Sequence, residues 1–128
     1  MSKLIKEDIT HQIIGCAYEV FNKLGFGFLE SVYKKSMFIE LNKNELKVEQ
    51  EKPLKVYYES RVVGDFFVDL LVADEIVIEL KSVQNLLKQH EVQLVNYLNG
   101  LDKEIGLLIN FGPNGVDVKR KYRKLQKE

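Results

Sequence analysis

The stretch "VDLLVADEIVIELKS", residues 68–82, decides the fold, because it combines the pattern of a buried β-hairpin with three ionisable side chains. Two nearly all-apolar runs flank a short acidic turn at residues 73–75. Asp69 interrupts the first run, and Glu79 and Lys81 interrupt the second. Burying an unpaired ionisable group costs several kcal/mol, so these three side chains need partners.

The alternation of side chains along each strand fixes how the two strands face each other. With a three-residue loop at 73–75, the apolar sides of both strands match, whereas a slip by one residue would bury the wrong set. This register predicts three cross-strand pairs: Leu70 with Ile78, Val72 with Ile76, and Asp69 with Glu79. Side chains in that relation lie roughly 5 Å apart at Cβ.

Two carboxylates that face each other on a hydrophobic hairpin repel and destabilise it. A divalent cation between Asp69 and Glu79 removes the difficulty, since Mg²⁺ prefers a few carboxylate oxygens together with water and phosphate oxygens. Lys81 lies one pleat along on the same side and adds a positive charge there. The alternative is that Lys81 pairs with Asp69 or Glu79 in an ordinary salt bridge.

The rest of the sequence predicts helices both before and after this hairpin along the chain. Asp8 is expected to cap a first helix that Gly25 ends, and Pro53 interrupts a strand region at 46–59. The further predicted elements are helices at about 28–42 and 85–98, and strands at 62–72, 76–81, 104–112 and 116–122. The order α-α-β-β-β-α-β-β predicts an α/β fold with a mixed sheet, in which the third helix connects two parallel strands.

Length and composition favour one domain in the cytoplasm. The 128 residues suit one domain over residues 1–118 and a basic tail over residues 119–128. The tail has six basic residues and one acidic residue, so residues 1–118 carry −5 in a chain of zero net charge. No membrane partner is expected, and one cysteine, Cys16, rules out an internal disulfide. An acidic body of this kind is not typical of proteins that hold nucleic acid by a broad basic surface.

The spacing of Asp69, nine further residues, and then Glu79-Leu80-Lys81 resembles the D…(D/E)xK signature of the PD-(D/E)xK nuclease superfamily. Val68 stands where that superfamily has its proline. The stretch "GFLESVY" resembles the motif of the GxxExxY family, a small-protein branch of the superfamily, and "QLVNY" is similar to the Q-x-x-x-Y element of RecB-like nucleases. The residues that carry these motifs are Gly27, Glu30, Tyr33, Gln93 and Tyr97.

The resemblance implies a restriction-endonuclease-like sheet and a nuclease site. Asp69, Glu79 and the Leu80 carbonyl would hold Mg²⁺, for which Mn²⁺ may substitute, while Lys81 would orient the attacking water. Glu30 would complete the metal shell directly or through water, and Gln93 would help to position water or phosphate. For Glu30 the alternative is a helix N-terminal acid stabilised by the helix dipole, and for Tyr33 it is a core residue with a bonded hydroxyl.

The expected partner is nucleic acid, DNA before RNA, and a homodimer is possible. Tyr97 and the basic residues at the C-terminus are the candidate contacts to it, namely Lys119, Arg120, Lys121, Arg123 and Lys124. The alternative for the tail is a solvated, frayed end. A second hypothesis of a different class is a nuclease-fold module that binds nucleic acid or a protein without cutting. A small-molecule hydrolase finds little support, because the chain has no G-x-S-x-G elbow and no zinc-ligand spacing.

Overall fold

The predicted hairpin is present in the computed structural model, which describes residues 3–123. Its strands are β2 (Arg61–Val72) and β3 (Ile76–Lys81). The observed register confirms the prediction from side-chain alternation at two positions, with Leu70 opposite Ile78 and Val72 opposite Ile76. The loop at residues 73–75 holds two non-glycine residues in left-handed conformation, Ala73 and Asp74, with φ of 53° and 58°.

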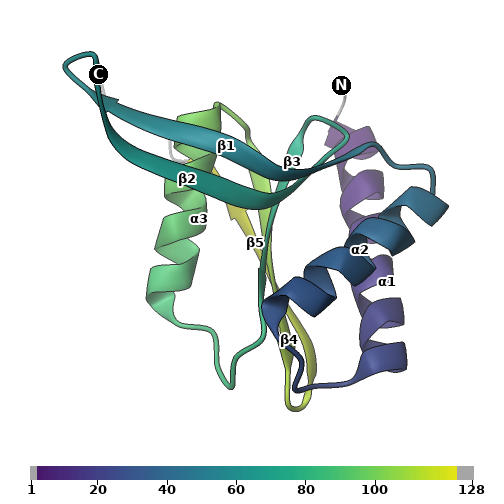
Figure 1. The fold of residues 1–128 in the computed structure, drawn as a ribbon. Helices are drawn as coiled ribbons and strands as arrows, with labels where there is room; N and C mark the ends of the chain where they lie inside the picture. Colours follow the sequence, from purple (N-terminus) through teal and green to yellow (C-terminus); the bar gives the residue numbers. More distant parts are fainter. Residues whose placement is uncertain (1–2, 124–128) are drawn as a thin grey trace.

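The remaining elements follow in the predicted order (Figure 1). Within residues 3–123 they are α1 (Lys3–Leu24), α2 (Glu30–Lys43), β1 (Val48–Tyr58), α3 (Lys88–Leu101), β4 (Ile105–Gly112) and β5 (Gly115–Tyr122). The strands form a mixed sheet in the order β1-β2-β3-β4-β5. The pair β3 and β4 is parallel and the other neighbours are antiparallel, so α3 lies on the crossover between parallel strands.

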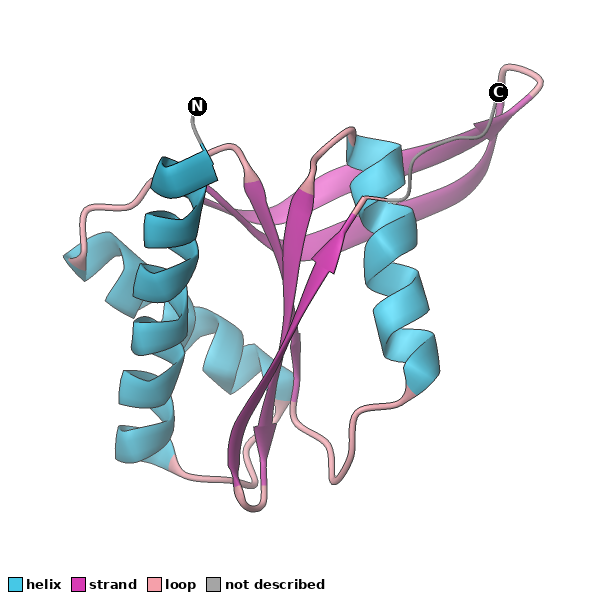
Figure 2. Cartoon of the chain, turned by 180° about the vertical axis from the view of Figure 1, so that it is seen from behind, coloured by secondary structure: helices cyan, strands magenta, loops and turns pink. Residues whose placement is uncertain are grey.

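Helices cover both faces of the sheet, with α1 and α2 on one side and α3 on the other (Figures 1 and 2). The larger core cluster packs the α1–α2 side against alternate residues of β3 and β4, including Ile78 and Ile109. The smaller cluster packs α3 through Leu94 and Leu98 against the intervening residues, such as Val77. Because β3 and β4 are buried on both faces, they are nearly continuous apolar runs, and Glu79 stands out among them.

Beyond the sheet's centre, β1 and β2 continue as a two-stranded arm, residues 52–58 and 61–68, that passes beside α3 (Figure 1). The arm carries large exposed apolar side chains, including Tyr57, Tyr58 and Phe67. Pro53 does not interrupt β1, as the sequence had led us to expect, but pairs with Phe67 within one strand. An edge strand tolerates proline, because one side of its backbone needs no partner strand.

Other boundaries differ from the sequence prediction. The first helix already includes Lys3, so Asp8 is not its N-cap; the Asp8 carboxylate instead accepts a hydrogen bond from the Gln12 side chain over 3.2 Å within the helix. The third helix begins at Lys88 rather than 85. Strand β5 runs to Tyr122, which places the first residues of the predicted tail in the sheet. None of the helices in the described part of the chain has the length and apolar character needed to span a membrane.

Candidate metal centre

Asp69 and Glu79 meet where β2 separates from β3. The antiparallel ladder ends at the pair Leu70 and Ile78. Beyond it, the backbone N–H groups of Asp69 and Leu80 form hydrogen bonds with side chains instead of with the opposite backbone. The N–H of Asp69 donates to Oε2 of Glu79, and the N–H of Leu80 donates to Oδ2 of Asp69, each over 2.8 Å. Each carboxylate therefore accepts a hydrogen bond from the opposite strand, and the two acids lie together at this divergence.

The divergence has a local cause in β2. Val68 and Leu71 both pack in the cluster under α3, whereas Leu70 packs toward α1 and α2. An undistorted strand would place Val68 and Leu70 on the same face, so β2 turns at Asp69. Glu51 of β1 lies opposite this turn, between the pairs Gln50–Leu70 and Lys52–Val68, and has a left-handed φ of 53°.

Burial makes both acids hard to ionise. Glu79 is 7% exposed, and the Asp69 side chain is 20% exposed. Burial and then the charge of Asp69 raise the pKa of Glu79 to about 8. Burial also raises the pKa of Asp69, although the Leu80 N–H and the charge of Lys34 oppose that shift. Without a bound cation, burial and the charge of Asp69 therefore favour the protonated form of Glu79.

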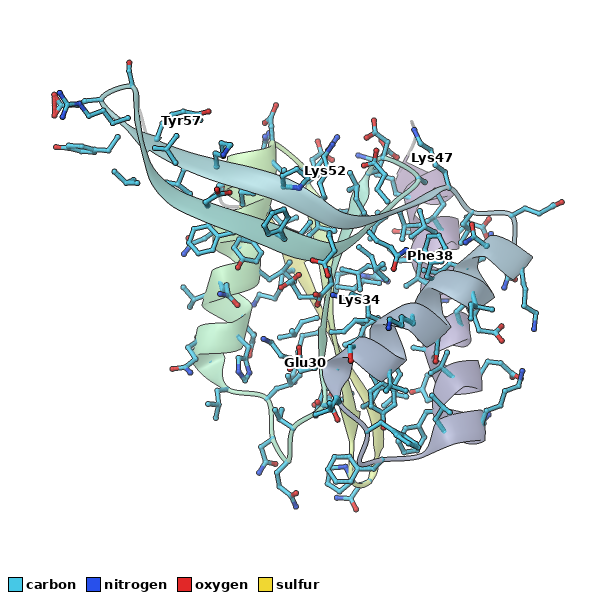
Figure 3. The ribbon with its side chains drawn as sticks, in the orientation of Figure 1. Glu30, Lys34, Phe38, Lys47, Lys52 and Tyr57 are labelled. Carbon is cyan, nitrogen blue, oxygen red and sulfur yellow. The ribbon has the colours of Figure 1, made fainter. Side chains whose placement is uncertain are left out.

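Lys34 is a member of the site that the sequence did not reveal. Its ammonium lies 3.8 Å from Oδ1 of Asp69 and also forms an ion pair with Glu51. Figure 3 shows Lys34 and Glu30 extending from α2 toward the middle of the sheet. Lys34 follows Glu30 by four residues and so shares its helix face, which is the one signal in the sequence that links it to the predicted site.

Lys81 is half-buried, and its positive charge opposes the rise in the pKa of both acids, after the larger effects of burial. Within residues 3–123 it forms no ion pair, so the alternative salt bridge to Asp69 or Glu79 is not present. The structure gives that role to Lys34 and leaves the Lys81 ammonium available beside the two acids.

Glu30 is near the pair without joining it. Its charge contributes to the raised pKa of Glu79, after burial and Asp69, but its side chain is exposed at the first turn of α2. Among the described side chains, no three His, Cys, Asp or Glu residues come close enough together to hold one metal ion. The role expected for Glu30, completing a metal shell directly or through water, therefore stays a prediction.

The donor set nevertheless fits a hard divalent cation. The buried carboxylate of Glu79 and the half-buried carboxylate of Asp69 converge, and the Leu80 N–H points toward Asp69. In an extended strand the carbonyl of a residue faces the same edge as its N–H, so the Leu80 carbonyl faces the edge that β2 has left. Mg²⁺ is commonly bound by one or two carboxylates and keeps its other positions for water and phosphate oxygens, which matches these oxygen donors.

Tyr33 fixes the loop that leads to Glu30. The Tyr33 side chain is fully buried and stacks on Phe111 with ring centroids 4.3 Å apart. Its hydroxyl donates to the Gly25 carbonyl and accepts from the Phe28 N–H over 3.4 Å, as expected for a core tyrosine with a bonded hydroxyl. Gly27 between them has φ of 120°, which favours glycine. Tyr33 and Gly27 of the GxxExxY spacing thus fix the loop that leads to Glu30.

Tyr33→Phe is expected to lower the free energy of unfolding by about 1–2 kcal/mol, because two backbone groups of the loop lose their partner. Urea unfolding measures this loss. Tyr18→Phe is the matched control, since Tyr18 is 50% exposed and its loss of a hydroxyl should change little. Equal stability of both variants would show that the hydroxyl of Tyr33 does not hold the loop.

Helix α3 approaches the acids from the other face through Tyr97. Burial raises the pKa of Tyr97, and the charges of Glu79 and Asp69 raise it further, so the phenol lies within their reach. Gln93 lines the same cavity as Tyr97, but it is exposed and has no hydrogen bond to either acid within the described chain. His90 accepts a hydrogen bond from the Leu87 N–H at the start of α3, which is a capping role.

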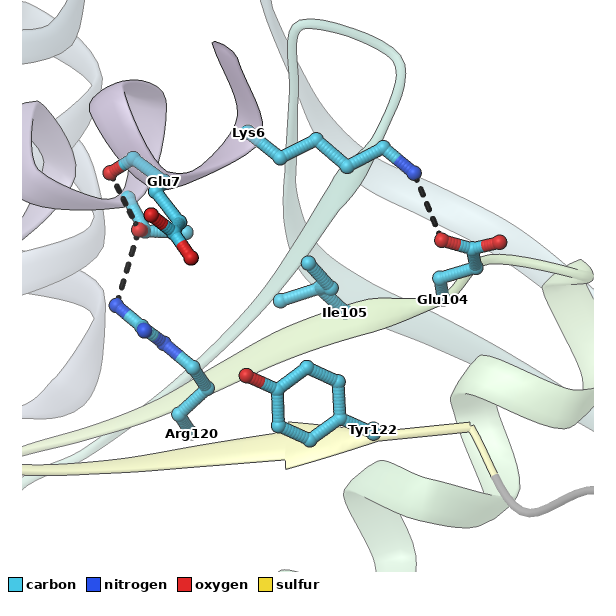
Figure 4. Close-up of a pocket in the computed structure, with 7 residues that line it drawn as sticks. Lys6, Glu7, Glu104, Ile105, Arg120 and Tyr122 are labelled. Atoms are coloured by element: carbon cyan, nitrogen blue, oxygen red, sulfur yellow. Dashed lines mark hydrogen bonds and ion pairs between the residues drawn. The ribbon is translucent and has the colours of Figure 1, made fainter. Parts of the chain in front are cut away.

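The basic residues of the predicted tail are largely engaged elsewhere. Arg120 donates to the buried Thr10 hydroxyl beside a cavity of about 300 Å³ between α1 and the sheet (Figure 4). Lys121 pairs with Glu91 over 3.0 Å, and Arg123 pairs with Asp102. Lys119 lines a separate cavity near the β4–β5 turn. Lys124 lies outside the described residues.

Asn110 is a second residue that the sequence analysis missed. It is 3% exposed in β4, next to Lys81 in the register. Its amide donates to the Val83 carbonyl and accepts from the Val83 N–H, each over 2.9 Å. This paired contact fixes the chain that leaves β3 directly after Lys81.

Comparison with known proteins bears on the fold and on the family. The crystal structure of SSO0001 matches the fold with a TM-score of 0.60 at 21% sequence identity, covering 75% of this chain and 52% of that one. The present chain thus spans about half the length of that structure. Among curated proteins, none matches this sequence. The model of the PD-(D/E)XK nuclease superfamily matches residues 7–124. Since that match covers nearly the whole sequence, the chain belongs to the PD-(D/E)XK nuclease superfamily.

Proposed function

We propose that this protein is a metal-dependent nuclease that hydrolyses phosphodiester bonds of DNA or RNA, with Mg²⁺ held by Asp69, Glu79 and the Leu80 carbonyl. Nucleases of this superfamily generally use divalent metals. The observation that carries the proposal is the buried acid pair at the divergence of β2 and β3, where Glu79 has a pKa of about 8. Such a perturbed pair of acids is typical of a functional site.

A bound Mg²⁺ or Mn²⁺ would polarise the scissile phosphate and lower the pKa of a coordinated water. The residues of the chain supply the rest. Asp69 and Glu79 must both be ionised to bind, so Glu79 gives up its proton. The ammonium of Lys81 orients the attacking water and stabilises the charge that develops on the phosphoryl oxygens. Its half-buried position strengthens that interaction relative to a charge in water.

Glu30 and Gln93 are proposed to act from the rim of the same site. Glu30 is close enough for its charge to affect Glu79, and a water molecule can bridge a carboxylate to a metal that it does not touch. Gln93 is free to contact water or phosphate, since the described residues give it no hydrogen bond. The loop fixed by Gly27 and Tyr33 supports membership of the GxxExxY branch as part of this proposal.

The direct test is cleavage of end-labelled single-stranded DNA, duplex DNA and RNA by purified protein. Cleavage of at least one substrate is expected with Mg²⁺ or Mn²⁺, with full loss of cleavage in EDTA and recovery after the metal is added back. Cleavage that continues in EDTA would contradict the proposal, and so would the absence of cleavage of all three substrates.

A non-catalytic module that binds nucleic acid or protein is the second candidate. The favouring observation is that Lys34 already places a positive charge on Asp69, and no third acid joins the pair among the described residues. Titration with Mn²⁺ separates the two candidates, because a module without catalysis has no need of a cation between Asp69 and Glu79.

A further inference from the structure

A cavity of about 650 Å³ lies between α3 and the β1–β2 arm. Phe66 of β2 and Tyr97 of α3 form two of its walls, with ring centroids 5.8 Å apart, and Leu54 and Val56 of β1 contribute aliphatic surface. Figure 1 shows the arm passing beside α3 at this position. The volume is in the range of sites that bind small organic groups.

The helix side of the cavity is lined by primary amides. They form one stripe of α3 and consist of Gln89, Gln93, Asn96 and Asn99. Within residues 3–123 none of the four amides has a hydrogen-bond partner, so their donors and acceptors are available to a ligand. Every lining side chain is uncharged.

The ring of Phe66 packs against its own strand. A Cβ atom built on Gly64 would come within 2.6 Å of the Phe66 ring, so the ring lies directly against this glycine. The ring is nevertheless 40% exposed. A half-exposed aromatic ring that is seated against its own strand provides a flat surface for stacking.

The cavity also adjoins the acid pair. Tyr97 lines the cavity and also packs in the cluster that contains Val68, the residue before Asp69. The charges of Glu79 and Asp69 contribute to the raised pKa of Tyr97, after burial. A ligand in the cavity would therefore sit next to a phosphate held at the proposed metal site.

We propose that this cavity binds the base of an unpaired nucleotide adjacent to the scissile phosphate, so that the substrate is single-stranded nucleic acid rather than an uninterrupted duplex. The inference rests on the proposed nuclease function. A base is flat, neutral and rich in donors and acceptors, which matches an aromatic ring faced by free amides. A phosphate would require cations, which this cavity lacks. Bases of a duplex are stacked and paired, and so cannot enter.

The test is fluorescence anisotropy with four labelled probes of one length: single-stranded DNA, single-stranded RNA, blunt duplex DNA, and a DNA strand of abasic sites. EDTA prevents cleavage, so binding is measured independently of activity. At least one single strand with bases is expected to bind more tightly than both the duplex and the abasic strand. Comparison of the DNA and RNA strands shows which sugar is preferred.

Phe66→Ala is expected to weaken binding of that single strand by about 5- to 150-fold, because base stacking is lost. Phe66→Trp should restore it. Phe67→Ala is the matched control, since Phe67 is the next residue of β2, is 56% exposed and does not line the cavity. Thermal unfolding of each variant shows that it is folded.

Three outcomes would overturn the inference: no binding of either single strand, equal binding of the abasic strand or the duplex, or equal effects of Phe66→Ala and Phe67→Ala. The nuclease proposal can survive such a result if metal-dependent cleavage is present and unaffected by Phe66→Ala. Conversely, base-dependent binding without cleavage would support base binding by the cavity and would contradict the proposed nuclease activity.

Discussion

Asp69→Asn and Lys81→Ala are each expected to reduce metal-dependent cleavage by about 10³-fold or more. The first removes a charged ligand of the metal, and the second removes the ammonium that stabilises the charge developing on the phosphate. The asparagine keeps an oxygen that can accept the Leu80 N–H, so the hairpin is expected to fold. Lys81 has no ion pair within the described chain to lose. Initial rates on the best substrate with Mg²⁺ measure both effects.

Matched controls exist in the same hairpin. Asp74 lies in the loop between β2 and β3 with its side chain 65% exposed, and it pairs with Lys103 over 3.7 Å. Asp74→Asn and Lys103→Ala change the same formal charges away from the site and should leave the rate unchanged. Cleavage at the wild-type rate by Asp69→Asn and Lys81→Ala would point to a contaminating nuclease, and the proposed mechanism would fall.

Glu79→Gln is expected to stabilise the metal-free protein at pH 8 by several kcal/mol relative to the wild type. The pKa of Glu79 is raised from 4.5 to about 8 in the folded state. Between these values the folded protein holds more protons than the unfolded one, so the free energy of unfolding falls as pH rises through that window. Each pKa unit corresponds to about 1.4 kcal/mol. Glutamine cannot ionise, and its amide oxygen can still accept the Asp69 N–H.

Urea unfolding in EDTA at pH 5, 6.5 and 8 measures this difference. The gap between Glu79→Gln and the wild type should widen with pH and be smallest at pH 5. Glu59→Gln is the control, because Glu59 is exposed at the tip of the β1–β2 arm and should follow the wild type. A wild-type curve with no steeper loss of stability than that of Glu79→Gln would show that Glu79 ionises as easily in the folded protein as in the unfolded chain.

The hairpin could be predicted because two local signals agree in it. The apolar sides of residues 62–72 and 76–81 match in one register, and a three-residue loop satisfies that register. The same alternation predicts that Asp69 and Glu79 lie together. It did not show how the chain tolerates them, because the two backbone N–H groups become available only where the strands separate.

The rest of the site depends on contacts between distant segments. Glu51 lies opposite Asp69 only because β1 pairs with β2. Lys34 reaches Glu51 and Asp69 only because α2 packs over these two strands. The helical spacing within α2 places Lys34 on the same face as Glu30, but it does not show which acids Lys34 contacts. The acid pair is thus partly neutralised by the protein itself, through Lys34 rather than through the Lys81 salt bridge that was the alternative to a bound cation.

The basic residues illustrate a different limit. Residues 119–128 have the composition of a solvated tail, but β5 continues to Tyr122. Side chains that alternate along this edge strand meet partners on both faces, with Arg120 directed to Thr10 of α1 and Lys121 to Glu91 of α3. Composition alone does not reveal such partners, since they lie about 30 or more residues away in the chain.

Calorimetric titration of the metal-free protein with Mn²⁺ shows whether Asp69 and Glu79 together bind one divalent cation. At pH 7 we expect one Mn²⁺ per chain with release of close to one proton, because Glu79 must ionise, and tighter binding at pH 8.5. Repeating the titration in buffers of different ionisation enthalpy measures the proton. The account would be contradicted if the wild type bound no Mn²⁺, or if a protein carrying both Asp69→Asn and Glu79→Gln bound it equally well.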